Sequence, residues 1–306
     1  MGKAIAAVAA FACVSALVGG APARADDAPK DPTVALTVDG QTRTAIVHVP
    51  APMPDIAKVP LVLMFGGRLA EGAAQQRMSH FNQVADQNGF IAVYPRGYQG
   101  SWNDGRRDTP AYQDGVKDVA FIRALLHHLK QAYPVDPKRV YAVGMSNGGM
   151  FVQRLACVMT KQFAAVATVA AVMPKTVAKR CAPARPLSMM MIMGTADPLM
   201  PYNGGTFGKA VLLSAKASAR LWREADGCKQ TSTVNLPDLV ADGTKTQVLI
   251  GKHCKRQSVV KLYTVEGGGH TWPGGTQYLP VSTIGRTSAD FDASRTIWSF
   301  FAAKGH

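Results

Sequence analysis

Short apolar runs alternate with amphipathic stretches along most of this chain. Each run is about the length of a strand and is largely apolar, as expected of strands that are buried on both faces of a sheet. The runs are residues 60–65, 90–94, 139–144, 164–172, 187–193 and 259–265. Strands that alternate with helices form βαβ units, so the pattern predicts an α/β fold with a doubly wound, mostly parallel sheet and helices on both faces.

Apolar residues at helical spacing predict the helices between these strands. The predicted helical segments are around residues 81–85, 119–129, 209–225 and 289–303. Two strands, residues 34–38 and 44–49, flank Asp39-Gly40, a hairpin signal. No repeat, low-complexity tract or long linker divides the chain, so residues 26–306 are interpreted as a single domain.

The N-terminus has the features of a secretory signal peptide over residues 1–25. Lys3 gives it a positive start, Ala4 to Val18 is an apolar run of small residues, and Ala23-Arg24-Ala25 fits a cleavage site. The run is shorter than the roughly 20 apolar residues of a membrane span, and no later segment is long and apolar enough. We therefore expect an exported protein, secreted or periplasmic, without an integral membrane segment.

The chain is strongly basic, with 34 Lys and Arg against 20 Asp and Glu, and a formal net charge of +14. Such an excess attracts anionic polymers, envelope surfaces or carboxylate-bearing substrates. The basic residues form no run and no stripe interleaved with aromatic residues, however. We therefore expect no nucleic-acid partner and interpret the charge as a surface property of an exported protein.

The apolar run that ends at Gly144-Met145-Ser146-Asn147-Gly148 is followed by a stretch able to form a helix. G-x-S-x-G at a strand-to-helix turn places a serine hydroxyl clear of the sheet, where it can act as a nucleophile. The helix then points its N-terminal N–H groups at the reacting oxygen. Ser146 is therefore the candidate nucleophile.

A serine hydroxyl needs a base to take its proton, and the base needs an acid partner. On such a turn the acid and the histidine follow the serine in that chain order. Asp197 follows the run at 187–193 after Gly194-Thr195-Ala196, and His270 lies on a glycine-rich loop after the run at 259–265. Taken alone, Asp197 before Pro198 also fits a turn residue and His270 an ordinary loop histidine; their joint arrangement favours an acid and a base.

Acyl transfer also needs two N–H groups that bind the oxyanion of the intermediate. One is expected from Asn147, the residue after the nucleophile. The other is expected from the loop after residues 61–65, at Gly67, which otherwise fits a plain glycine turn.

Four cysteines remain outside the predicted leader, and three pairings are open to them. We favour Cys157–Cys181 and Cys228–Cys254 because each closes a local loop. His253 beside Cys254 suggests a metal ligand pair, but no second close-spaced pair accompanies it, so no metal site is expected.

Several segments together resemble the secreted polyhydroxybutyrate depolymerase and feruloyl esterase group of the α/β-hydrolase superfamily. They are residues 101–105 (SWNDG), 134–141 (PVDPKRVY), 144–150 (GMSNGGM), 181–186 (CAPARP), 194–198 (GTADP) and 267–275 (GGGHTWPGG). The resemblance implies an α/β-hydrolase fold and a serine esterase with nucleophile Ser146, acid Asp197 and base His270. Members of this group usually carry His-Gly after the first buried strand, whereas this chain has Phe65-Gly66-Gly67.

The resulting hypothesis is an exported serine esterase that cleaves carboxylic esters through an acyl-enzyme and needs no cofactor. The resemblance favours a hydroxyalkanoate polyester or its oligomers; the alternative substrate is a feruloyl or acetyl ester on plant polysaccharide. Trp272, Trp102 and Tyr202 are the candidates for substrate contact, although Trp102 also fits a packing residue and Tyr202 an exposed one. Acyl transfer to another acceptor uses the same residues, and a non-catalytic binding protein on a hydrolase shell is the alternative of another class.

Overall fold

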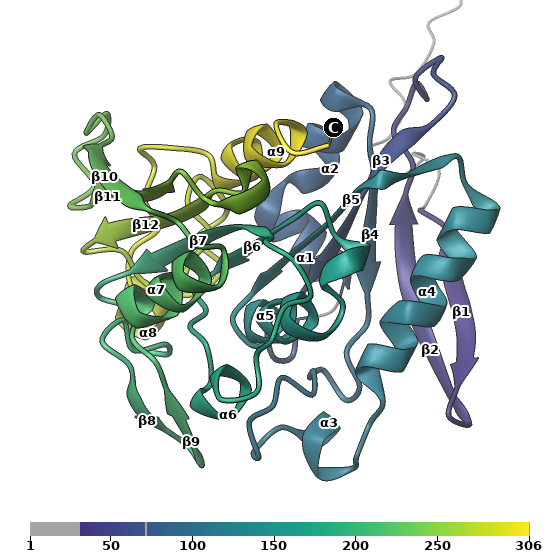
Figure 1. Ribbon diagram of the computed structural model, residues 1–306, viewed down its shortest axis with the longest axis horizontal. Coiled ribbons are helices and arrows are strands. Elements are labelled where there is room, and N and C mark those ends of the chain that lie inside the picture. The colour runs from purple at the N-terminus through teal and green to yellow at the C-terminus, as the bar shows by residue number, and fades with distance from the viewer. Residues whose placement is uncertain (1–30, 71, 306) are drawn as a thin grey trace, which may run out of the picture. The chain divides into compact units, whose positions relative to one another are not determined.

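The computed structural model describes residues 31–70 and 72–305, and within them one large sheet organises the fold (Figure 1). Ten strands form this sheet in the order β1-β2-β4-β3-β5-β6-β7-β12-β11-β10. Its strands are β1 (Thr33–Val38), β2 (Gln41–His48), β3 (Val59–Phe65), β4 (Ile91–Pro95), β5 (Val135–Met145), β6 (Ala165–Val169), β7 (Ser188–Gly194), β10 (Gln230–Asn235), β11 (Lys245–Lys252) and β12 (Val260–Glu266). The predicted leader, residues 1–25, lies outside the described residues, and the single-domain assignment stays a prediction.

The centre of the sheet is parallel and its two edges are antiparallel. Strands β4, β3, β5, β6, β7 and β12 run parallel to one another. Strands β1 and β2 add an antiparallel hairpin at one edge, and β10 and β11 add another at the other. The predicted parallel core is confirmed, and the fold is that of an α/β-hydrolase.

Helices cover both faces of the sheet because side chains of each strand alternate between two apolar clusters. In β3, Leu61, Leu63 and Phe65 enter one cluster while Val62 and Met64 enter the other. Helices α4 (Asp118–Ala132), α5 (Asn147–Val158) and α7 (Ala215–Ala225) pack on the first face. Helices α1 (Gly72–Ser79), α2 (Phe81–Asn88) and α9 (Ala293–Ala302) lie on the second (Figure 1).

Short elements occupy the loops between the main strands. They are α3 (Pro110–Gln113), α6 (Lys175–Ala178), α8 (Val281–Ile284), the 3-10 turns η1 (Thr160–Gln162) and η2 (Lys255–Gln257), and a small hairpin of β8 (Gly205–Phe207) and β9 (Ala210–Leu212). This hairpin corrects the predicted helix over 209–225. Gly208 has φ +56 and permits a tight turn, and the helix begins only after Ser214, whose hydroxyl accepts the N–H of Ala217.

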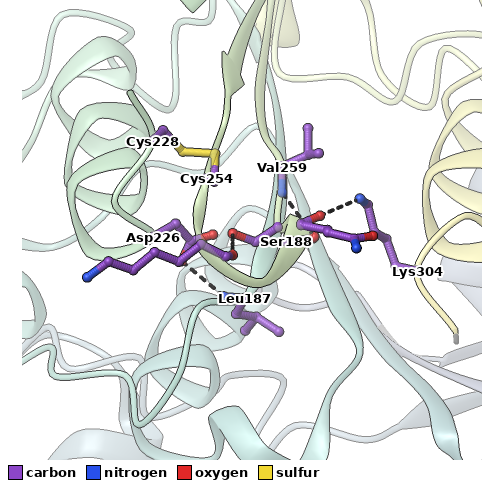
Figure 2. The surroundings of a disulfide bond; sticks show 10 residues. Leu187, Ser188, Asp226, Cys228, Cys254, Val259 and Lys304 are labelled. Atoms are coloured by element: carbon purple, nitrogen blue, oxygen red, sulfur yellow. Dashed lines mark hydrogen bonds between the residues drawn. A yellow bond between two sulfur atoms is a disulfide. The ribbon is translucent and has the colours of Figure 1, made fainter. Parts of the chain in front are cut away.

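Two disulfides close local loops, Cys157 to Cys181 and Cys228 to Cys254, which is the favoured pairing. Figure 2 shows the second, which ties the end of α7 to the segment after β11. The carboxyl of Asp226 lies just below it and accepts the N–H of Leu187 at 3.0 Å. This region therefore joins α7, β7 and β11 at one end of the sheet.

Candidate active site

Ser146 occupies the sharp turn between β5 and α5. Its backbone has φ 55 and ψ −123, a strained conformation for a residue with a side chain. The Ser146 N–H donates to the carbonyl of Val169 on β6 at 3.0 Å, which holds the turn against the sheet. A Cβ at Gly148 would lie 2.3 Å from the carbonyl oxygen of Phe65, so only glycine fits there. The sequence thus folds into the predicted strand-to-helix turn.

Asp197 and His270 meet in a buried hydrogen bond. Oδ2 of Asp197 lies 2.8 Å from Nδ1 of His270, and the two residues are 8% and 4% exposed. Oδ1 of Asp197 accepts the N–H groups of Leu199 and Met200 at 2.8 and 2.7 Å. The carboxylate is thereby fixed in one orientation, with its second oxygen directed at the imidazole.

The loops that carry Asp197 and His270 are packed backbone against backbone. The N–H of Ala196 donates to the carbonyl of Gly268 at 2.9 Å. A Cβ at Gly194 would lie 2.2 Å from that same carbonyl oxygen, so the approach requires a glycine. The N–H of His270 in turn donates to the carbonyl of Ile284 at 2.6 Å. The acid and the imidazole are therefore held by adjacent strands, β7 and β12.

Ser146 and His270 both line one cavity of about 370 Å³. The structure has no hydrogen bond between the Ser146 hydroxyl and the imidazole, an arrangement common before a substrate binds. Most other lining residues are apolar: Ala70, Ala74, Met78, Met145, Leu199, Met200, Phe207, Leu279 and Ile284. The cavity therefore offers an apolar space beside a serine, with an oriented histidine at its wall.

The two expected oxyanion donors lie on either side of Ser146. Asn147 is the first residue of α5, where backbone N–H groups have no partner within the helix. A Cβ at Gly67 would lie 3.3 Å from Cβ of Ser146, so this backbone passes directly beside the serine. Among the described residues, nothing accepts a hydrogen bond from the N–H of Gly67. Both backbone segments thus border Ser146.

Trp102 is a packing residue, which corrects its assignment to substrate contact. It is 1% exposed and stacks on Phe151 with ring centroids 5.0 Å apart. Its indole N–H donates to the carbonyl of Gly66 at 3.2 Å. The Phe65 ring, where members of the group usually have histidine, packs edge-on against Trp102 at 5.2 Å. Phe65, Trp102 and Phe151 therefore form an aromatic cluster that packs beneath the Gly66-Gly67 loop on the core side and is hydrogen-bonded to it through Trp102.

Trp272 and Tyr202 do not line the cavity either. Trp272 is fully buried, and its indole N–H donates to the hydroxyl of Ser294 at 3.0 Å. Tyr202 is 9% exposed, and its hydroxyl is hydrogen-bonded to that of Thr264 at 2.8 Å. Closeness in sequence to His270 and Asp197 suggested contact with a substrate, but both side chains turn into the protein.

Tyr278 is a cavity residue that the sequence did not reveal. Its hydroxyl donates to the backbone carbonyl of His270 at 2.8 Å. Burial, together with the negative charge of Asp197, raises the pKa of Tyr278 to about 12. The hydroxyl thus stays a donor at neutral pH and holds the histidine loop in place.

Asp104 and Arg106 are two further residues that the sequence analysis missed. Oδ2 of Asp104 accepts hydrogen bonds from Nδ2 of Asn147 at 2.5 Å and from Nε of Arg106 at 2.9 Å. Burial raises the pKa of Asp104, while the charge of Arg106 opposes that rise. The residue after the serine is thus held by a buried carboxylate, which in turn holds an arginine that lines the cavity.

Over residues 31–70 and 72–305, no three His, Cys, Asp or Glu side chains gather closely enough to hold a metal ion. In the same ranges, no helix combines the length and the apolar character needed to cross a bilayer.

Several known proteins are similar to this chain in sequence or fold. Residues 45–198 match the family model described as Esterase PHB depolymerase. The protein named "Putative esterase NocK" of Nocardia uniformis subsp. tsuyamanensis is 30% identical over 278 residues, 87% of this chain and 80% of that protein. Feruloyl esterase B of Piromyces equi is 29% identical over 239 residues, which cover 74% of this chain and 42% of that protein.

The solved structure of an acetyl xylan esterase from Aspergillus awamori has a TM-score of 0.57 to this chain at 14% identity, covering 78% of this chain and 94% of the other. At that identity the likeness shows a shared fold alone. The family match, by contrast, spans half of the chain and includes both the serine turn and Asp197. The chain therefore belongs to the Esterase PHB depolymerase family, whose members are esterases.

Proposed function

We propose that this protein is a serine esterase in which Ser146 is the nucleophile, His270 the general base and Asp197 its acid partner. The observation that carries the proposal is the buried 2.8 Å contact between Asp197 and His270 at the wall of the cavity that Ser146 also lines. An imidazole held by a carboxylate at Nδ1 has Nε2 free to take a hydroxyl proton.

In the proposed mechanism, His270 removes the proton of Ser146 as the serine oxygen attacks the ester carbonyl. The N–H groups of Asn147 and Gly67 stabilise the resulting oxyanion. His270 then protonates the leaving alcohol, and an acyl-enzyme forms on Ser146. Water, activated by the same imidazole, releases the acid and regenerates the serine.

The substrate class that we favour is a short hydroxyalkanoate polyester or oligomer. The family description supports it, and so does the apolar lining of a cavity at the small end of the range for ligand sites. Small branched acyl units fit such a space. A feruloyl ester on plant polysaccharide is the second candidate, supported by the similarity to feruloyl esterase B.

We also propose that the protein acts after export, with residues 1–25 as a cleaved leader. The two disulfides support this location, because such bonds persist in oxidising compartments.

The test of the nucleophile is the variant Ser146→Ala, assayed on p-nitrophenyl butyrate beside the wild type. We expect turnover to fall by at least about 10³-fold, with an unchanged circular dichroism spectrum. A fluorophosphonate probe should label the wild type and not the variant. Near wild-type turnover by the variant would refute the assignment, and a folded wild type that neither labels nor turns over would support the binding-protein alternative. Clearing of amorphous polyhydroxybutyrate beside ferulate release from arabinoxylan separates the two substrate classes.

A further inference from the structure

Arg106 is an arginine held rigidly at the wall of the active-site cavity. It lies in the loop between β4 and α3 and is 5% exposed. Its Nε donates to Asp104, whose same oxygen accepts the side chain of Asn147. The guanidinium centre also lies 5.4 Å from the centre of the Phe207 ring. The buried guanidinium of Arg106 and the side chain of Asn147, the residue after Ser146, are therefore held by the same carboxylate oxygen of Asp104.

Most of the hydrogen-bonding capacity of Arg106 is unused. A guanidinium carries five N–H donors in a planar fork. The Nε donor is used by Asp104, and Asp108 lies 3.8 Å from it. Within the described residues, the four donors on the two terminal nitrogens have no hydrogen-bond acceptor. Such a fork suits a carboxylate, which can accept two parallel hydrogen bonds.

A second cavity, of about 230 Å³, adjoins the first at Arg106, which lines both. Four further cations line it, and all four are exposed: Arg107, Lys175, Lys179 and Lys209. Within residues 31–70 and 72–305, none of the four has a carboxylate at ion-pair distance. We call Arg106 and these four residues the basic pocket. Beside it lies a partly exposed acid, Asp108, 3.8 Å from Nε of Arg106.

Three segments far apart in sequence supply these cations. Arg107 comes from the loop before α3, Lys175 and Lys179 from α6 and its end, and Lys209 from the turn between β8 and β9. Pro174, just before α6, pairs with Leu212 of β9, which fixes two of the segments together. In Figure 1, α3, α6 and the β8–β9 hairpin extend to the same side of the sheet. These cations are brought together by folding, and the sequence contains no run of basic residues that would indicate the cluster.

We propose that the basic pocket binds a carboxylate of the ester substrate, so that the enzyme prefers esters that carry a free carboxylate beyond the scissile bond. The inference rests on the proposed function. Oligomers of hydroxy acids have this chemistry. At each of their ester bonds, the fragment that leaves as the alcohol ends in the free carboxylate of the oligomer. With the acyl group in the apolar cavity, the leaving hydroxy acid extends past Arg106 into the basic pocket.

The test compares hydrolysis of 3-hydroxybutyrate dimers and trimers as free acids with hydrolysis of their methyl esters, which lack the charge. For the wild type we expect kcat/KM to be about tenfold higher for the free acid at 50 mM NaCl, and the ratio to shrink at 500 mM NaCl. Arg106→Gln should lower the ratio about tenfold, and Arg106→Lys should lower it less. Lys179→Gln and Lys209→Gln should each lower it about twofold. The matched control is Lys229→Gln, an exposed lysine that lines neither cavity, which should keep the wild-type ratio.

The ratio separates charge recognition from a structural role of Arg106. If Arg106→Gln slows both substrates equally, Arg106 acts by positioning Asp104 and Asn147, and the proposal is overturned. A wild-type ratio near one, independent of salt, excludes the terminal carboxylate of the oligomer as the ligand while esterase activity on p-nitrophenyl butyrate still stands. If Ser146→Ala hydrolyses p-nitrophenyl butyrate as fast as the wild type, the proposed function itself is wrong.

A second arm of the test locates the source of the carboxylate. Feruloylated or acetylated glucuronoxylan is compared with the same polymer after chemical reduction of its uronic acids. A salt-sensitive preference for the unreduced polymer, weakened by Arg106→Gln, would support the basic pocket with a uronate as its ligand. Absence of a preference in both arms contradicts carboxylate recognition altogether.

Discussion

Asp226 is a buried carboxyl whose ionisation we expect to destabilise the protein. It is fully buried, and Oδ1 accepts the N–H of Leu187 at 3.0 Å (Figure 2). Oδ2 has no hydrogen-bond partner among the described residues, because the nearby Ser258 hydroxyl donates to the carbonyl of Lys255. Burial raises the pKa of Asp226 from 3.8 to about 6. Replacing it by asparagine keeps the acceptor for Leu187 and removes the charge.

The sign of the effect follows from the raised pKa. The folded protein holds the proton of Asp226 more tightly than the unfolded chain does, so this contribution to stability is full below pH 3.8 and is lost as the pH rises through about 6. Between pH 4.5 and 7.5, a shift of this size lowers the free energy of unfolding by about 2 kcal/mol. Asp226→Asn should not lose that amount, so its advantage over the wild type should grow by about 2 kcal/mol over this range.

The assay is thermal unfolding of both proteins at pH 4.5, 6 and 7.5, analysed as the difference in Tm at each pH. For a domain of this size, 2 kcal/mol corresponds to about 4–8 °C. Asp55→Asn, at an exposed position, is the control and should change the difference by less than about 0.5 kcal/mol. If the Tm difference between Asp226→Asn and the wild type is the same at pH 4.5 and 7.5, ionisation of Asp226 does not lower the free energy of unfolding, and the reasoning is refuted.

Two further predictions concern the site itself. Asp197→Asn should keep the fold but lower kcat on p-nitrophenyl butyrate by about 10³–10⁴-fold, since the amide no longer stabilises protonated His270; a loss under tenfold in steady-state kinetics would point to another acid. Trp102→Phe removes the hydrogen bond to the Gly66 carbonyl and should lower kcat about tenfold with little change in KM, as measured with esters of increasing acyl size. If KM for the bulky esters rises instead, Trp102 contacts the substrate after all.

The sequence could predict the parts of the fold that depend on local patterning. The continuous apolar runs marked β3, β4, β5 and β7, because a strand between two helical layers has no polar face. The strand-to-helix turn at Ser146 could be predicted because the backbone passes so close to its neighbours there that only glycine fits at positions such as Gly148. Asp197 and His270 could be predicted to lie close together because each follows an apolar run, and the carboxyl ends of parallel strands meet at one edge of the sheet.

The rest depended on tertiary contacts that no local pattern shows. Trp272 lies two residues from His270 in sequence, and Trp102 lies in a segment that carries the family resemblance. Both rings are nevertheless buried in the core, Trp272 against α9 and Trp102 in the aromatic cluster. The edge hairpin of β10 and β11 was missed because β10 is mostly exposed and lacks an apolar face. The basic pocket was missed because Arg107, Lys179 and Lys209 are brought together by loops, while the chain itself has no basic run.

Asp197 and His270 lie after neighbouring strands, and their loops share backbone hydrogen bonds, whereas Ser146 follows β5 across the intervening β6. The carboxylate and the imidazole therefore move as one body. In the proposed mechanism, a small shift between β5 and β7 would change only the distance between the hydroxyl and the imidazole, and the contact between imidazole and carboxylate would stay. If Ser146 and His270 act as we propose, binding of an ester has to bring together only the hydroxyl and the imidazole, because the second contact of the site is already made.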